Sequence, residues 1–261
     1  MRIFLWMLVL MPMLTSAQRN FSANQIETLK LAIDEFVGYD QYNSAYFTTN
    51  NVLVKFSSSE RLEYHNLSKG RISHVDISNP LMIVVFYADF NTIVFLDNQL
   101  NLIREIDFNA NESRLVVAAA GLAEQNKLWI YDSVLQQLML YDYANNRFRM
   151  LSAPLVNGIE YFETTLTSFK WIDRVGDVFS CNVYGEIKSF GKMPEYNHVM
   201  FATDNTLFFT NNGKLFFTDL AKNEVTAVPG VGNSVSKFYY KDQILAIFTN
   251  TGLTKFQITL P

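Results

Sequence analysis

The feature that most constrains this fold is a unit repeated along the chain: an apolar or aromatic run, a turn of Asn, Asp or Gly, and a second apolar run. Asn and Gly tolerate positive φ, so such turns between apolar runs predict β-hairpins. Six copies stand out, with their turns in parentheses: residues 45–56 (50–51), 82–96 (89–91), 128–141 (132–133), 177–190 (184–185), 206–217 (211–213) and 243–256 (250–252).

The spacing of the turns predicts how these hairpins assemble. Successive turns lie roughly 28 to 50 residues apart, and the commonest interval of about 40 residues is the length of a four-stranded propeller blade. Flanking strands are expected at 71–77, 102–108 and 147–151. The interval is shortest after the fourth copy, where residues 191–196 leave little room for an outer strand. We therefore predict an all-β, single-domain β-propeller of six blades. A sandwich or barrel is the alternative, but neither needs so regular a unit.

A ring of blades must be closed, and the last hairpin ends at residues 260–261 with no room for a fourth strand. Residues 28–33 alternate apolar and polar side chains, which is the pattern of a strand. We expect this strand to pair with residues 255–260 and complete the last blade. The alternative is a short N-terminal helix, since residues 22–25 have the form of a capping box and Ile26, Leu29, Ile33 and Phe36 would share one face.

The N-terminus has the pattern of an export signal. Arg2 precedes an apolar run over residues 3–14, and small residues at 15–17 offer a cleavage site before Gln18. We predict a signal peptide at 1–17 and a propeller domain at 18–261. The run is shorter than the roughly 20 residues that span a bilayer, so no transmembrane segment is expected after cleavage. No Cys follows the run, which argues against a lipoprotein. The expected location is the periplasm, with secretion as the alternative.

Composition excludes several classes of function. A net charge of -4 provides no basic surface for phosphates, which argues against nucleic-acid binding. Cys181 is the only cysteine, so an internal disulfide cannot form. Hydrophobic residues make up 49% of the chain and aromatic residues 15%, so packing can supply the stability.

Motifs that carry chemistry are missing from the sequence. His65, His74 and His198 fall in different copies without metal-ligand spacing, and Cys181 lies in a predicted strand. Aspartates follow many strand ends, where such side chains usually accept hydrogen bonds from nearby backbone amides. No calcium loop, phosphate-binding loop or nucleophile elbow is found. We therefore expect no enzyme activity, no catalytic residues, no cofactor and no metal, although two carboxylates could still meet at a channel mouth, as in glycosidases.

Aromatic side chains are the remaining lead to a binding surface. They concentrate in the third and fourth copies, and they can anchor a protein partner or stack on sugars: Trp129, Tyr131, Tyr141, Tyr143 and Trp171. The alternative is that they pack between neighbouring sheets. Sequons occur at Asn20, Asn66 and Asn111. Ser133, in the run Asp-Ser-Val at 132–134, resembles an O-glycosylation site of some Gram-negative periplasms.

Several runs resemble a known family, namely residues 72–81, 86–92, 96–101, 125–131 and 140–143. They are similar to small exported propeller proteins of Gram-negative envelopes and, more loosely, to WD40-like and quinoprotein-like propellers. The resemblance covers most of the mature chain and implies a propeller without an established activity. The chain lacks the repeated Trp-docking motif and the cofactor ligands of quinoproteins, so the resemblance implies no cofactor.

The function expected from the sequence is a non-enzymatic periplasmic scaffold that binds a protein partner. The partner is expected in an outer-membrane complex that serves protein assembly or secretion, an expectation that rests on fold analogy. The alternative is a carbohydrate-binding module or hydrolase that uses the propeller channel. A channel mouth lined by apolar or small residues would argue against the enzyme.

Overall fold

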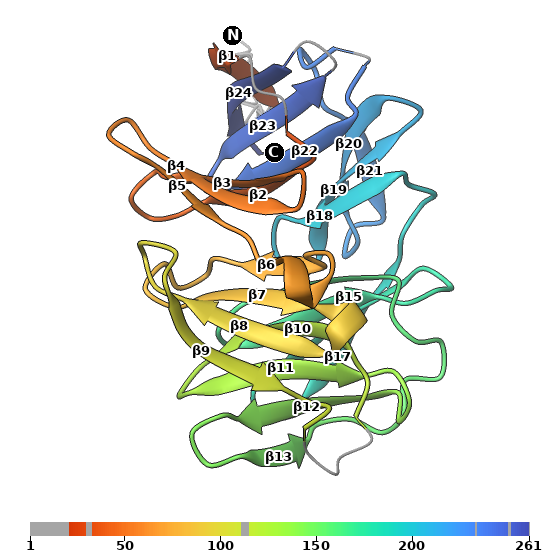
Figure 1. The fold of residues 1–261 in the computed structure, drawn as a ribbon. Coiled ribbons are helices and arrows are strands. Elements are labelled where there is room, and N and C mark those ends of the chain that lie inside the picture. Colours follow the sequence, from red (N-terminus) through yellow and green to blue (C-terminus); the bar gives the residue numbers. More distant parts are fainter. Residues whose placement is uncertain (1–20, 30–32, 111–114, 233, 250–251, 261) are drawn as a thin grey trace, which may run out of the picture.

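The computed structural model describes residues 21–29, 33–110, 115–232, 234–249 and 252–260. It contains six antiparallel sheets of four strands each, arranged in a ring as the blades of a β-propeller (Figure 1). The predicted fold class and the number of blades are therefore confirmed. The proposed cleavage site before Gln18 lies outside the described residues.

Each blade runs from an inner strand to an outer strand. The first two blades contain β2 (Glu35–Tyr39), β3 (Ala45–Thr49), β4 (Val52–Phe56) and β5 (Arg61–Tyr64), then β6 (His74–Asp76), β7 (Ile83–Tyr87), β8 (Thr92–Leu96) and β9 (Leu102–Asp107). The third and fourth contain β10 (Val117–Ala123), β11 (Lys127–Asp132), β12 (Gln137–Asp142) and β13 (Arg147–Met150), then β14 (Tyr161–Thr164), β15 (Ser168–Ile172), β16 (Asp177–Asn182) and β17 (Ile187–Lys192).

The last two blades complete the ring. They contain β18 (His198–Phe201), β19 (Thr206–Asn211), β20 (Lys214–Asp219) and β21 (Glu224–Ala227), then β22 (Lys237–Lys241), β23 (Ile244–Thr249), β24 (Gly252–Thr259) and β1 (Ser22–Leu29). Two single turns of 3-10 helix, Leu67–Lys69 and Ala88–Phe90, lie in the connections.

An N-terminal strand closes the ring, as predicted, but it begins earlier than the predicted residues 28–33. Figure 1 shows β1 beside β24, and the register pairs Ser22 with Thr259 and Thr28 with Thr254. The strand begins at Ser22, so the helical alternative for residues 22–25 is wrong. Lys255 of β24 reinforces the closure: its ammonium lies 3.4 Å from the Glu27 carboxylate and 4.3 Å from the centre of the Tyr39 ring in the first blade.

The fourth predicted hairpin is real but occupies a different place in its blade. Residues 177–190 form β16 and β17, the outer pair, whereas the central pair is β15 with β16. The central turn therefore lies at residues 173–176, where Asp173 accepts hydrogen bonds from the amides of Val175 and Asp177. With this turn in place the six central turns are spaced by about 40 residues throughout, and the irregular interval of the sequence disappears.

Aspartates stabilise the turns, as the sequence predicted. Each accepts a hydrogen bond from the amide two positions further along, which is the geometry of an Asx turn. The aspartates that do so are Asp40, Asp76, Asp97, Asp107, Asp132, Asp142, Asp173 and Asp219.

The core lies between the blades, because each sheet is covered on both faces by its neighbours. This explains why central strands such as β7 and β8 are almost entirely apolar and are buried at every position. Cys181 is buried in the same way, and burial raises the pKa of its thiol to about 11. A buried thiol with a raised pKa is a packing residue rather than a nucleophile.

Candidate functional site

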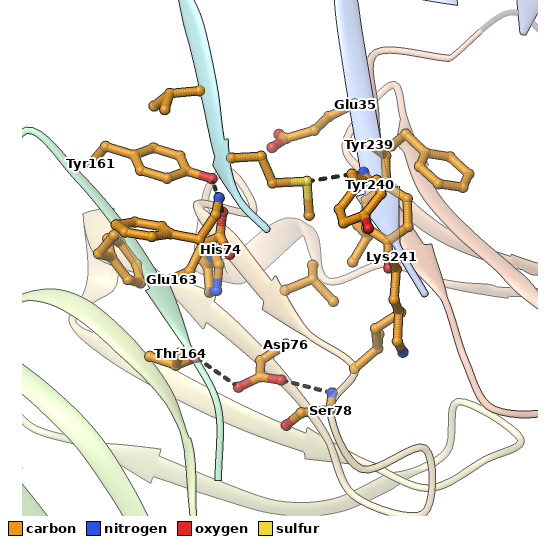
Figure 2. A pocket seen from close by; sticks show the side chains of 18 of the residues that line it. Glu35, His74, Asp76, Ser78, Tyr161, Glu163, Thr164, Tyr239, Tyr240 and Lys241 are labelled. Atoms are coloured by element: carbon orange, nitrogen blue, oxygen red, sulfur yellow. Dashed lines mark hydrogen bonds between the residues drawn. The ribbon is translucent and has the colours of Figure 1, made fainter. Parts of the chain in front are cut away.

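A channel of about 1020 Å³ runs between the inner strands of the propeller (Figure 2). Five of the six inner strands line it, namely β2, β6, β14, β18 and β22. The lining includes carboxylates, imidazoles, lysines and aromatic rings. It is therefore not the apolar or small-residue surface that would have argued against an enzyme.

The sixth inner strand, β10, is closed off from the channel by its two neighbours. Its sequence is rich in Ala and contains Gly121, where an added Cβ would lie 2.1 Å from the Thr164 hydroxyl of β14. This lack of a side chain lets β14 approach β6. The Thr164 hydroxyl then donates to the Asp76 carboxylate over 3.1 Å, and the Leu122 amide of β10 donates to the same carboxylate over 2.7 Å. Asp76 thus joins three blades, and both of its carboxylate oxygens accept hydrogen bonds.

Four ionisable side chains gather in the channel above this contact. Glu35 comes from the first blade, His74 from the second, and Tyr161 and Glu163 from the fourth, on the far side of the ring (Figure 2). We call them the channel cluster. Glu163 Oε1 accepts hydrogen bonds from the Tyr161 hydroxyl over 2.6 Å and from the Phe201 amide of β18 over 2.8 Å. Successive side chains of β14 point to opposite faces of the sheet, so Tyr161 and Glu163 point towards the fifth blade and Thr164 towards the third.

Burial shifts the pKa of two members of the cluster in opposite directions. It lowers the pKa of the His74 imidazole, against the charges of Asp76 and Glu35, which raise it. It raises the pKa of the Glu163 carboxyl, against the hydrogen bonds from Tyr161 and the Phe201 amide and the charge of Lys170. Both shifts favour the neutral form of the side chain, because burial penalises a charge.

Lysines line the same channel, but each is directed to an acceptor outside the cluster. Lys170 pairs with Asp204 at 2.9 Å. Lys237 donates to the backbone carbonyl of Asp34 over 2.8 Å, and Lys241 donates to the carbonyl of Tyr39 over 3.1 Å.

A second feature lies on the face of the ring where the β7–β8, β11–β12 and β15–β16 turns meet the connections between blades. Large apolar side chains are exposed in these turns and connections of the second, third and fourth blades. We call this set the apolar arc, and it consists of Leu67, Phe90, Val116, Val134, Leu135, Val156 and Val175. Val156 is 87% exposed and Leu67 is 85% exposed.

Hydrogen bonds between the loops hold the arc together. The buried Asp132 carboxylate accepts from the amides of both Val116 and Val134. The Leu155 amide donates to the Gln136 carbonyl over 2.7 Å, which joins the loop that carries Val156 to the β11–β12 turn. The segments that carry Val116, Val134 and Val156 are therefore fixed relative to one another.

The five aromatics predicted as a partner surface do not form one, because the structure buries them. Their exposed fractions are all below a tenth: Trp129 0%, Tyr131 5%, Tyr141 2%, Tyr143 8% and Trp171 2%. They pack between blades; the Trp129 indole, for example, donates to the carbonyl of Thr165 in the next blade over 2.8 Å. An exposed binding role for them is wrong.

Ser133 does lie in an exposed turn, where its hydroxyl contacts the Val116 carbonyl at 3.1 Å. Its glycosylation stays a prediction. Among the sequons, Asn20 and Asn111 lie outside the described residues, and Asn66 caps a 3-10 turn through its side-chain oxygen.

The channel cluster was missed in the sequence because its members lie far apart in the chain. His74 and His198 were interpreted as scattered histidines, yet both line the channel. Assigning each inner strand to its blade would have shown that residues 35, 74 and 163 share one axis. In the described part of the chain, no three His, Cys, Asp or Glu side chains are grouped as a metal site requires. Nor does any helix within the described ranges have the length and apolarity to cross a membrane.

Comparisons with known proteins support the fold. The sequence matches no protein-family model and no curated protein. Among solved structures, a member of the DUF4221 family from Bacteroides vulgatus has a TM-score of 0.63 at 10% identity, covering 93% of this chain and 99% of that one. A streptogramin B lyase has a TM-score of 0.58 at 12% identity, covering 92% and 98%. The β-propeller domain of Myceliophteria thermophila Cps50 (Swd1) has a TM-score of 0.58 at 11% identity, covering 91% and 100%. At such identities these likenesses establish a β-propeller and nothing about activity.

Proposed function

We propose that this protein is an exported, non-enzymatic scaffold that binds a protein partner through the apolar arc. The main observation that supports this proposal is the presence of seven large exposed apolar side chains on one face of three neighbouring blades. A gathering of large exposed apolar side chains on one face of a protein is a feature of interaction sites. Asp132 fixes the segments that carry Val116 and Val134 before binding, which reduces the conformational entropy that association loses.

Co-purification tests this proposal. The full-length protein is tagged, extracted from its native cells in mild detergent and compared with the double variant Val134→Asp/Val156→Asp. Tyr184→Asp is the matched control, because Tyr184 is 85% exposed but lies in the β16–β17 turn on the opposite face. We expect one envelope protein to accompany the wild type and the control but not the arc variant. Recovery of only free monomer, or retention of the partner by the arc variant, would overturn the proposal.

The same proposal places the protein in the periplasm, in a complex that assembles or secretes outer-membrane proteins. The support is the export-signal pattern of residues 1–17. Osmotic-shock fractionation followed by N-terminal sequencing tests it. We expect release with the periplasm and a mature chain that begins at Gln18, whereas a cytoplasmic protein that retains Met1 would contradict export.

The channel cluster favours a second candidate function, a carbohydrate-binding module or hydrolase. Glu35 and Glu163 come from blades on opposite sides of the ring, an arrangement that can place two carboxylates across a sugar. The raised pKa of Glu163 suits a general acid. Hydrolysis of aryl glycosides is measured for the wild type, for Glu163→Gln and for the control Glu224→Gln on outer strand β21. Activity of the wild type and the control, together with an inactive Glu163→Gln, would establish the enzyme. If the wild type neither hydrolyses aryl glycosides nor binds a glycan, both the hydrolase and the carbohydrate-binding module are excluded.

A further inference from the structure

The channel carries an inference that is independent of the apolar arc, because most of the hydrogen-bonding capacity left open in the channel cluster is that of acceptors. The Glu35 carboxylate is exposed to the channel and has no side-chain hydrogen bond or ion pair with any other described residue. Both hydrogen bonds to Glu163 end on Oε1, so within the described structure Oε2 is left without a donor. The His74 ring has no hydrogen-bond partner among the described side chains, and a neutral imidazole retains one acceptor nitrogen. The open positions of the cluster are therefore mainly acceptors, namely the Glu35 carboxylate, Glu163 Oε2 and one His74 nitrogen, against the single N–H of the His74 ring.

Two donors next to the cluster are already used. The Tyr161 hydroxyl donates to Glu163, and the Lys170 ammonium is held by Asp204. A ligand that supplies donors and positive charge would satisfy the cluster, whereas an anion would meet two carboxylates.

Aromatic rings complete the lining. Phe36, Phe162 and Tyr239 border the same channel, and the Phe162 ring lies 4.9 Å from the ring of His74, centre to centre. Ring faces attract cations and also pack against alkyl chains. The same wall already contains such a contact, with the Lys170 ammonium 5.6 Å from the centre of the Phe201 ring.

We propose that the channel binds a small organic cation, an alkylamine or alkylguanidine. Its charged group lies between Glu35 and Glu163 and donates to them and to His74, while its alkyl chain packs against Phe36 and Phe162. The channel volume of about 1020 Å³ leaves room for a ligand of drug-like size.

Isothermal titration calorimetry with three probes of equal chain length tests this inference: pentylamine, pentanol and pentanoate. They differ in charge and hardly in size. We expect pentylamine to bind the full-length protein at least about tenfold more tightly than either of the others, since tenfold corresponds to about 1.4 kcal/mol, a realistic value for a buried cation. Agmatine, which carries a guanidinium as well as an amine, serves as a second cation.

Two variants test whether pentylamine binds at the channel cluster. Glu35→Gln/Glu163→Gln removes both charges but keeps the size of the side chains, and we expect it to lose at least about tenfold in pentylamine affinity. Glu224→Gln, an exposed carboxylate on the outer strand, is the matched control and keeps the wild-type affinity. Failure of both cations to bind, stronger binding of pentanol or pentanoate, or equal affinity of the double variant would each overturn the inference. None of these results bears on the apolar arc.

Discussion

The Thr164 hydroxyl of the fourth blade donates a hydrogen bond of 3.1 Å to the Asp76 carboxylate of the second blade, across the inner strand of the third. Two blades that are not neighbours in the ring thus meet directly. The meeting depends on Gly121, which leaves room for Thr164. The channel owes its shape to this contact, because it removes β10 from the lining.

A methyl group at Gly121 should break this contact. In Gly121→Ala the new Cβ would lie 2.1 Å from the Thr164 hydroxyl, so β14 must move away from β6. We expect the free energy of unfolding to fall by about 1–3 kcal/mol, the usual effect of overpacking. Urea denaturation measures it, and the double variant Gly121→Ala/Thr164→Ala should recover part of the loss. Ala118→Ser, at an exposed position of the same strand, is the control, and equal stability of Gly121→Ala and wild type would show that the strands are not in close contact.

Glu163 should reduce stability at neutral pH, because burial raises its pKa in the folded protein. A carboxyl with a raised folded pKa contributes stability below its ordinary value of 4.5 and loses that contribution as the pH rises through the folded value. Glu163→Gln stays neutral and can still accept from Tyr161. Denaturation at about pH 8 should therefore find the variant more stable than wild type, with the advantage shrinking towards about pH 4. A variant that is less stable at every pH would contradict the pKa shift.

His74 should produce the opposite pH dependence. Burial lowers its pKa below the ordinary 6.5, so the unfolded chain takes up a proton before the folded protein does. The stability that this group contributes is present above 6.5 and is lost as the pH falls towards the folded value. In His74→Phe, which keeps a ring against Phe162, that loss should be absent. Thermal melts from about pH 8 to about pH 5 would measure this loss of stability. Melting temperatures that fall in parallel for variant and wild type would contradict the lowered pKa.

The closing strand should be necessary for a stable ring. A chain that begins after Leu29 lacks β1 and leaves the backbone of β24 unpaired, and an unpaired edge invites aggregation. We expect such a chain to melt at lower temperature and to form oligomers, compared with one that begins at Gln18. Light scattering and calorimetry would detect both effects. A monomer with unchanged melting would mean that β1 is dispensable.

The repeat of apolar runs and Asn, Asp or Gly turns was enough to predict the ring, its number of blades and its closure. The fourth central pair was misplaced, because the turns at residues 173–176 and at Gly185 both have the expected composition and Lys170 interrupts the apolar run of β15. Exposure could not be predicted for Trp129 and the other aromatics, since a propeller buries both faces of each sheet. The channel cluster depends on which side chains of separate strands share the central axis, and that is tertiary information.

Site-specific photo-cross-linking tests the central claim, that a partner occupies the apolar arc, most directly. A photoreactive residue replaces Val156 in one variant and Tyr184 in another, two positions of nearly equal exposure on opposite faces. After irradiation of living cells, we predict one discrete adduct to an envelope protein from position 156 and none from position 184. Adducts of equal yield from both positions, or no adduct from 156, would contradict the account.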